Sequence, residues 1–451
     1  MRNLLAMLKQ IKRYPSAIVG VSIIGLLIGV SVYTVIAIPY SEAIRLWRGG
    51  PAVTRDNPQL AAPRWYDLFT RDRLSRTIVV RGAEDGIETV EPLDDGMVRM
   101  KLVLPFEYRY DTPPSEISLF TAIGGMDDPR TRYSVEWRSP DGTEVSVVER
   151  RSIRASDTYR ISQDGSLRME LGMVRPEVGL LGDRELLPGP EGRKPVKGQY
   201  EAVIVTELPE GAEFKADLVL YGEVFGLAGT DHRRRDIMVA LLWGTPLALV
   251  FGLLGAVGAN ISTFVLAGIS TWFGGKVDAL FQRITEVNMI LPILPILVMI
   301  GQFYSRSLWV MLGLIIALNV FSAGMKLYRA MFIQAKESPY IEAAQAYGAG
   351  NFRIIFRYLL PRIVPVLLPQ FVLVIPTFVF LEATLAVIGL GDPILPTWGK
   401  VIYDARVGDA LYKEFYYWMV QPAVLLMVTG FGFALVGYTL DRIFNPRLRS
   451  V

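Results

Sequence analysis

The sequence predicts an α-helical polytopic membrane protein with six spans and an inserted, mainly β extracytoplasmic domain. Of the 451 residues, 51% are hydrophobic and 20% are charged, a mixture that suits neither a pure membrane bundle nor a soluble enzyme. Long apolar runs occur near the start of the chain and throughout its second half. We therefore expect three regions: residues 1–40 with the first span, the extracytoplasmic domain 41–228, and a core with five further spans, 229–451.

Charge and residue usage exclude several classes of function. With 47 basic and 44 acidic residues spread along the chain, the net charge of +3 does not indicate a nucleic-acid partner. The absence of cysteine excludes disulfides, thiolate metal ligands and cysteine nucleophiles. The single histidine, His232, excludes any site built on two or more histidines. We therefore expect neither a catalytic site nor a metal site in this chain.

An apolar run of about 22 residues, Ala17–Ile38, is the first expected span, because a helix of this length crosses about 30 Å of hydrocarbon. Four basic residues precede it: Arg2, Lys9, Lys12 and Arg13. Positive charge beside a span favours the cytoplasmic side, so we expect a cytoplasmic N-terminus. A cleaved signal peptide is the alternative, but its apolar core would be shorter than this run.

Residues 41–228 have the alternation and the turn signals of a soluble β fold. In Tyr133–Val148, alternating apolar side chains flank the turn sequence Ser139-Pro140-Asp141-Gly142, which predicts strand, turn and strand. Further strands are expected at Val98–Leu104, Tyr200–Val205 and Leu218–Tyr221. A segment of about 180 residues is long enough for its own core. We expect a β sandwich, with a mobile loop at Gly182–Gly198.

The second half of the chain contains five more apolar segments. They are Ala240–Phe273, Ala279–Ile300, Leu308–Met331, Ile363–Gly389 and Tyr417–Leu440. Pro292 and Pro295 interrupt one of them, and Pro365, Pro369 and Pro376 are expected to bend another. The loop around the polar stretch 337–361 is the most basic one between spans, so it is expected in the cytoplasm, and the C-terminus is expected there as well. Its basic residues, counted from the end of the preceding span, are Lys326, Arg329, Lys336, Arg353, Arg357 and Arg362.

Within the loop 337–361 the sequence predicts two short helices. Ser338 can cap the first helix, and Gly348 and Gly350 supply the turn that ends it. Asn351 can cap the second helix, which Pro361 is expected to end. Four residues of the second helix recur at helical spacing and predict one apolar face: Phe352, Ile355, Phe356 and Leu359.

This loop resembles the cytoplasmic EAA loop of ABC-importer permeases, whose pattern is Glu-Ala-Ala, three residues, Gly, nine residues and Ile-x-Leu-Pro. The chain matches it at Glu342, Ala343, Ala344, Gly348, Leu360 and Pro361, with Tyr358 where the family usually has Ile. Ala344, Tyr347 and Gly348 share one helical stripe, whose small residues let a partner backbone come close. The resemblance implies that ATPase subunits bind this loop. The alternative is an ordinary helix between two spans, with alanines for helix propensity.

The stretch Gly229–Asp236 precedes the second span and resembles the signature Gly-Thr-Asp-x-x-Gly-Arg-Asp of the dipeptide, oligopeptide and nickel branch of these permeases. Arg234 stands where that signature has glycine. We expect Asp231 and Asp236 to pair with Arg235, and the remaining arginines to meet lipid phosphate. A role in gating and a simple interfacial anchor are both open.

Glu382 lies within the apolar segment Ile363–Gly389. A carboxylate inside a span is expected to face the helix bundle or a water-filled cavity. Glu382 is therefore a candidate for a gate or for the wall of a translocation path. A role in helix packing or at the membrane interface is equally open.

The resemblance implies a permease subunit of an ATP-driven ABC importer, with peptide as the favoured substrate. The chain has no Gly-x4-Gly-Lys-Ser/Thr, so ATP and Mg²⁺ are expected on partner subunits rather than on this chain. The implied partners are a homologous permease, two ATPase subunits or domains, an extracytoplasmic solute-binding protein and membrane lipids. The implied location is the inner cell membrane.

Two other functions of the chain compete with this one, and the role of the β domain is open. The chain can be a permease-like subunit of a non-importing complex that transmits force or signal to its extracytoplasmic domain. A membrane hydrolase is disfavoured, because the spans contain no histidine, cysteine or Gly-x-Ser-x-Gly. For the β domain itself, docking of the binding protein and a structural spacer are both open.

Overall fold

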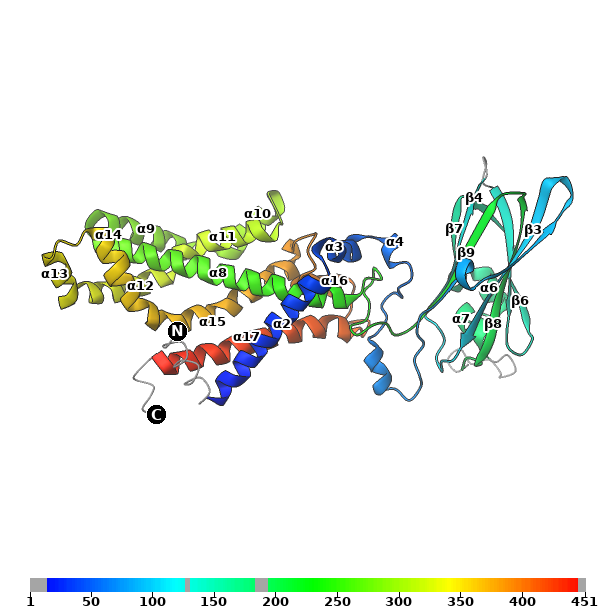
Figure 1. Ribbon diagram of the computed structural model, residues 1–451, viewed down its shortest axis with the longest axis horizontal. Coiled ribbons are helices and arrows are strands. Elements are labelled where there is room, and N and C mark those ends of the chain that lie inside the picture. The colour runs from blue at the N-terminus through cyan, green and yellow to red at the C-terminus, as the bar shows by residue number, and fades with distance from the viewer. Residues whose placement is uncertain (1–13, 126–129, 183–193, 445–451) are drawn as a thin grey trace. The chain divides into compact units, whose positions relative to one another are not determined.

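A computed structural model describes residues 14–125, 130–182 and 194–444 (Figure 1). The chain forms two compact units, one of helices (Met1–Arg48 with Val239–Val451) and one built on β-sheets (Gly49–Met238). Helix α3 (Tyr40–Arg48) therefore belongs to the helical unit, and the stretch 229–238 belongs to the β unit. The basic residues before the first span and most of the expected mobile loop lie outside the described residues.

Four described helices contain a stretch long and apolar enough to cross a membrane: α2 (Pro15–Ala37), α8 (Ile237–Phe273), α15 (Leu360–Leu385, which continues into a turn at Ala386–Leu390) and α17 (Tyr416–Phe444). Two bent pairs pass the same test: α9 (Gly275–Ile290) with α10 (Ile293–Phe303), and α11 (Leu308–Val320) with α12 (Ala323–Lys336). Counting each pair as one span gives six among the described residues. The helical unit also contains α16 (Trp398–Val407).

The bends in the two pairs have local causes. Helix α9 ends at Ile290 because Leu291 precedes a proline and adopts an extended conformation, and the axis then turns by 77° into α10. The second pair bends by 46°. Asn288 of α9 stabilises that bend, because its side-chain amide donates to the carbonyls of Leu318 (2.8 Å) and Phe321 (3.0 Å). In a continuous helix these carbonyls would accept from backbone amides further along the chain. Helix α15, by contrast, continues through Pro365, Pro369 and Pro376.

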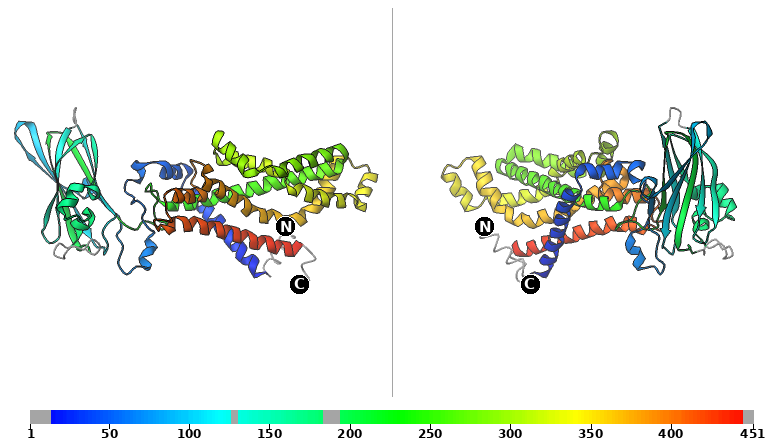
Figure 2. Two further views of the ribbon diagram at one scale, coloured as in Figure 1. Left: turned by 180° about the vertical axis from the view of Figure 1, so that it is seen from behind. Right: turned by 45° about the vertical axis from the view of Figure 1, so that its right-hand side comes forward.

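Helices α2 and α17 pack against each other where both carry glycine, and they lie together in every view (Figure 2). A Cβ on Gly20 would come within 2.8 Å of the Gly432 carbonyl oxygen, and one on Gly432 within 2.7 Å of an Ile23 methyl group. Small residues allow two membrane helices to approach closely, where dispersion forces hold them together. Close packing at these glycines therefore holds the first apolar helix to the last one, together with a hydroxyl contact between Ser16 and Thr439 (3.4 Å).

The β unit is a two-sheet sandwich (Figure 1). One sheet has the order β1-β9-β4-β7 and the other β2-β3-β8-β5-β6, with all neighbours antiparallel. The strands are β1 (Ile78–Arg81), β2 (Ile87–Pro92), β3 (Met97–Tyr108), β4 (Glu116–Gly124), β5 (Arg130–Arg138), β6 (Glu144–Arg154), β7 (Ser156–Arg160), β8 (Gly198–Pro209) and β9 (Glu213–Tyr221). Short helices α4 (Pro51–Thr54), α5 (Gly82–Asp85), α6 (Gly165–Glu170) and α7 (Pro176–Leu181) join them.

Both sheets contribute to one apolar core. Leu104 and Phe106 of β3 and Leu119 of β4 are buried in the same cluster as Trp137 of β5 and Leu218 of β9. Alternate residues of β3 point inward, as the side-chain period of a strand requires. All four strand regions expected from the sequence are strands, and the turn at Ser139–Gly142 joins β5 to β6 through a hydrogen bond from Ser139 N to Thr143 O (2.9 Å).

The two ends of the β unit are bonded to each other. The backbone amide of Leu60 donates to Asp231 O (3.2 Å), that of Ala62 to Glu223 O (2.9 Å) and that of Thr230 to Ala61 O (2.9 Å). The buried Thr230 hydroxyl adds a bond to Pro58 O (2.8 Å) and accepts one from Ala61 N (2.9 Å). The segment that enters the sandwich therefore runs beside the segment that leaves it.

Candidate functional site

The first loop helix, α13 (Pro339–Ala346), lies on an apolar platform. It buries Ile341 and Ala344 and exposes Glu342 and Ala343. Ile341 belongs to a cluster shared by α8, α12 and α15, which contains Phe264, Trp272, Tyr328, Phe332, Ile355, Leu359 and Leu367. The predicted cap is absent, because Ser338 occupies the N-cap position without a side-chain hydrogen bond. A displacement of α13 would reach three long helices through this cluster.

Gly348 ends α13 with a left-handed backbone, at φ +76°. The amides of Gly348 and Ala349 donate to Gln345 O (2.9 Å) and Ala344 O (3.0 Å), which closes the last turn. Apart from its chain neighbours, a Cβ at Gly348 would meet no atom of the described residues within 4 Å, so the position requires glycine for its backbone rather than for space. Tyr347, just before it, is 93% exposed.

The second loop helix differs from the prediction. Its N-cap is Gly350 rather than Asn351, and it does not end at Pro361: α14 (Asn351–Arg353) continues through a π-helical turn (Ile354–Leu359) into α15. A proline blocks an α-helix because its ring meets the carbonyl four residues back and it has no N–H to donate. The widened turn changes the spacing of the carbonyls just ahead of Pro361, and the helix passes through.

The π-helical turn also changes which residues are buried. Ile355 and Leu359 are buried as predicted, whereas Phe352 is 66% exposed and Phe356 is 51% exposed, with Ile354 buried in their place. The extra residue in the widened turn rotates the face by one position, which a constant helical period does not anticipate. Tyr347, Phe352 and Phe356 are thus three exposed aromatic side chains on the loop, and exposed aromatic residues are enriched at sites that bind a partner.

Two polar contacts that the sequence did not predict hold α12 to the corner between α8 and α9. Lys336 donates to Thr271 O (3.2 Å) and Trp272 O (2.9 Å) and lies 5.4 Å from the centre of the Trp272 ring. Arg329 forms an ion pair with Asp278 at 2.5 Å, and Ser270 donates to the same carboxylate at 2.8 Å. From the sequence we expected only that Lys336 and Arg329 lie on the cytoplasmic side. The positive-inside rule counts basic residues beside a span and does not predict which groups they contact.

The structure brings Asp231 and Arg235 together within the β unit. Their side chains pair at 2.5 Å and are 1% and 6% exposed, and the Asp231 carboxylate also accepts from the amides of Arg233 (2.8 Å) and Arg235 (2.9 Å). Asp236 accepts from Met238 N (2.8 Å), directly before α8. The arrangement is a hydrogen-bonded turn between the sandwich and α8.

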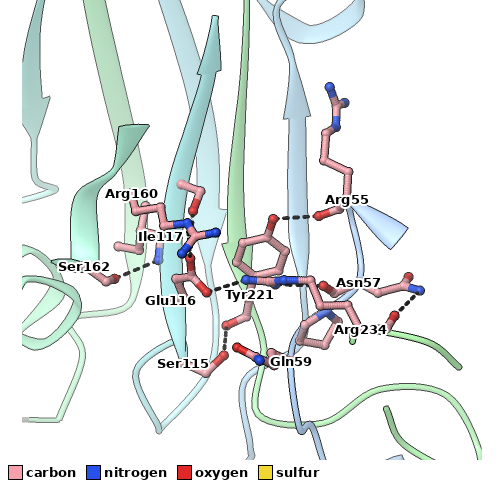
Figure 3. Close-up of polar contacts among 12 residues, drawn as sticks. Arg55, Asn57, Gln59, Ser115, Glu116, Ile117, Arg160, Ser162, Tyr221 and Arg234 are labelled. Atoms are coloured by element: carbon pink, nitrogen blue, oxygen red, sulfur yellow. Dashed lines mark hydrogen bonds and ion pairs between the residues drawn. The ribbon is translucent and has the colours of Figure 1, made fainter. Parts of the chain in front are cut away.

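Arg234 does not point to lipid phosphate as predicted (Figure 3). It pairs with Glu116 of β4 at 2.5 Å, donates to Asn57 O (2.9 Å) and stacks on Tyr221 of β9 at 4.1 Å. Its backbone is left-handed (φ +62°), which explains why the family signature has glycine at this position. A non-glycine residue in this conformation costs about 1–2 kcal/mol, which these contacts offset.

Asp236 provides a test by pH. Burial raises the pKa of its carboxyl above the ordinary value, so the folded chain holds the proton more tightly than the unfolded chain. The contribution of Asp236 to stability is therefore complete below the unfolded pKa, near 3.9, and decreases as the pH rises through the folded pKa. We expect wild type to gain stability relative to Asp236→Asn between pH 7 and pH 4, measured by pulse proteolysis of the β unit in urea. An unchanged difference would contradict this assignment.

Glu382 lies in the helical unit, in a buried environment. It is 5% exposed, and its Oε1 atom has no hydrogen-bond partner among the described residues. It borders a small cavity of about 10 Å³ together with Arg306 and Asp392. The Asp392 carboxylate accepts from Leu308 N (2.9 Å) at the start of α11 and from Ile394 N (2.8 Å). Among the described residues, no three histidine, aspartate or glutamate side chains are grouped to hold a metal ion.

Comparisons with known proteins match the helical half. The profile of the family described as binding-protein-dependent transport system inner membrane component matches residues 259–450. The oligopeptide transport system permease protein OppC of Bacillus subtilis is 30% identical over 226 residues, covering 49% of this chain and 72% of that protein. The dipeptide transport system permease protein DppC of the same organism is 28% identical, covering 49% and 68%. The MetNI methionine ABC transporter in inward facing conformations aligns with a TM-score of 0.32 and 20% identity, covering 46% of this chain and 96% of that one.

Proposed function

Since the chain belongs to the family of binding-protein-dependent transport system inner membrane components, we propose that it is the permease subunit of an ATP-driven importer of peptides. The names of OppC and DppC support the peptide class. They favour import over a non-importing complex that transmits force to the β unit. The observation that carries the proposal is the match to OppC over 72% of its length.

The loop 337–361 is the proposed site of coupling to ATPase subunits. Tyr347, Phe352 and Phe356 offer an exposed aromatic surface, and Glu342 and Ala343 are exposed on α13 beside it. Ile341, on the opposite face, contacts the cluster of α8, α12 and α15. A partner that binds ATP and closes would favour one position of α13, and the cluster would carry that preference into the spans. Leu360 and Pro361 continue this path, because they begin α15.

The remaining proposals concern partners and placement. ATP and Mg²⁺ bind to two ATPase subunits or domains, a homologous permease completes the pathway, and a solute-binding protein delivers the substrate. The chain lies in the inner membrane with both termini in the cytoplasm and with the β unit outside. Glu382, buried in a span, contributes to the gate between the permeases or to their packing.

The test is import by the complete complex in proteoliposomes. With ATP on the ATPase side and binding protein on the other, we expect a labelled tripeptide to accumulate above its external concentration. ADP should give equilibration at most. ATP hydrolysis that the binding protein stimulates, without accumulation of any peptide tested, would overturn the importer assignment.

A further inference from the structure

A cleft of about 650 Å³ opens within the β unit, beside the four-stranded sheet. Its walls come from β4, β7 and β9 and from the two segments that enter and leave the sandwich. The residues that matter here are Glu116, Phe120, Arg160, Tyr221, Arg233 and Arg234 (Figure 3 shows four of them). The volume lies within the range of about 300–1,000 Å³ that is typical of small-molecule sites. The family profile begins at residue 259, so the match assigns nothing to this cleft.

The cleft has more positive charge than its own carboxylate can neutralise. Four arginines and a single carboxylate, Glu116, line it. Arg55 pairs with Asp217 (2.8 Å) and Asp56 (3.1 Å). Arg234 takes one oxygen of Glu116 at 2.5 Å, while Arg160 is 4.0 Å from the other. The Arg160 side chain is 57% exposed, and Arg233 is exposed and forms no ion pair among the described residues. Arg160, with a long contact to Glu116, and Arg233 are therefore the two exposed guanidinium groups at the cleft.

The position of Arg234 explains why Arg160 remains available. In the family signature this residue is glycine, and in this chain an arginine adopts the left-handed backbone that glycine would adopt without strain. Its guanidinium lies over the Tyr221 ring and engages Glu116, the acidic residue that would otherwise pair fully with Arg160 (Figure 3). Strain at a single residue is a sign of function when the surrounding contacts are built to hold it.

The other walls indicate what kind of anion fits. Phe120 provides partly exposed aromatic surface, and Gln59, Gln163 and Thr158 provide uncharged hydrogen-bonding groups. Tyr221 is 1% exposed and lies beneath Arg234, so it supports the arginine rather than a ligand. Two arginines can donate paired N–H groups to the oxygens of one carboxylate, and the neutral polar groups can form hydrogen bonds with peptide amides. A polyphosphate would need more charge than Arg160 and Arg233 supply.

We propose that this cleft binds the C-terminal carboxylate of a short peptide, with Arg160 and Arg233 as its ligands and with the last side chain against Phe120. The choice of peptide rests on the proposed function, whereas the choice of an anion rests on the cleft alone. The β unit then holds an accessory binding site for the transported class of molecule, separate from the membrane path.

The experiment measures binding to the full-length chain in nanodiscs, without ATPase subunits or binding protein. The probes are a fluorescent tripeptide with a free C-terminal carboxylate and the same tripeptide as a C-terminal amide. We expect the amide to bind at least about tenfold more weakly. Equal affinity of acid and amide would overturn the proposal. Inorganic phosphate that competes as well as the peptide would show a general anion site and would also overturn it.

Variants assign the binding to these residues. Arg160→Gln with Arg233→Gln should weaken the acid at least about tenfold and leave the amide unchanged, while Arg160→Lys with Arg233→Lys should recover part of the affinity. Arg99→Gln is the matched control. It also replaces an exposed arginine by glutamine, but it removes an ion pair with Glu207 on the other sheet, away from the cleft. Undiminished binding by the Gln pair would overturn the proposal. If the chain binds no peptide but the complex still imports it, this inference fails and the proposed function stands.

Discussion

Gly348→Val is expected to abolish coupled import in the reconstituted complex. The residue has φ +76°, a conformation that costs a side chain about 1–2 kcal/mol and a β-branched one more. A penalty of that size on the docked loop weakens its engagement roughly tenfold or more. Valine would also add bulk to the open side of the turn, where the part of the chain that the structure describes makes no contact with an added Cβ and where the ATPase is proposed to bind. Peptide uptake and binding-protein-stimulated ATP hydrolysis in proteoliposomes measure the result.

Gly350→Val is the matched control for that experiment. Gly350 lies two residues further along the same loop, also with open space around its Cβ position, but with an ordinary extended backbone (φ −68°, ψ 156°). We expect it to keep most of the import activity. The coupling assignment is wrong if Gly348→Val imports like wild type, or if both valines fail equally while the complex no longer assembles.

Asp231→Asn is expected to destabilise the β unit by about 3 kcal/mol or more, the usual cost of removing one partner of a buried ion pair. Asp231 and Arg235 are 0% and 5% exposed, and the carboxylate also holds two amides of the turn. An asparagine keeps the shape but not the charge opposite the buried guanidinium. The urea midpoint of the β unit, followed by pulse proteolysis of the full chain in detergent, should fall accordingly.

Asp236→Asn serves as the control for this prediction, because it is the same change five residues along. Asp236 caps Met238 N, a contact that asparagine can also provide, and its buried carboxyl carries a penalty when it is charged, so we expect no loss of stability at neutral pH. The pair of variants also decides between anchor and gate. A stable Asp231→Asn chain that fails to import would favour a gate and contradict the structural assignment.

The sequence predicted the elements that depend on local signals. Six apolar segments correspond to described helices or bent pairs, and Ser139-Pro140-Asp141-Gly142 is the turn between β5 and β6. Gly348 ends α13 because its left-handed backbone is a local property of the chain. The break at Pro292 is local in the same way, because the residue before a proline is biased toward the extended conformation that Leu291 adopts.

What the sequence did not predict depends on contacts between distant segments. The π-helical turn at Ile354–Leu359 shifted the buried face, so Phe352 and Phe356 are exposed where a constant period predicted burial. Arg234 was expected at lipid, yet its partner Glu116 is 118 residues away in sequence, and no periodicity connects them. The one available signal was the arginine at a position where the family signature has glycine, because a side chain there needs contacts that stabilise a left-handed backbone.

The bonded ends of the β unit also matter for how such a chain can arise. Backbone hydrogen bonds at Leu60, Ala62 and Thr230 join the segment that enters the sandwich to the segment that leaves it. The two points at which the sandwich is inserted into the rest of the chain can therefore lie close together. A domain whose termini lie together can be spliced into a short connection between two helices without forcing them apart. The same adjacent ends would allow the sandwich to be exchanged for another fold in the course of evolution while the helical unit is left unchanged.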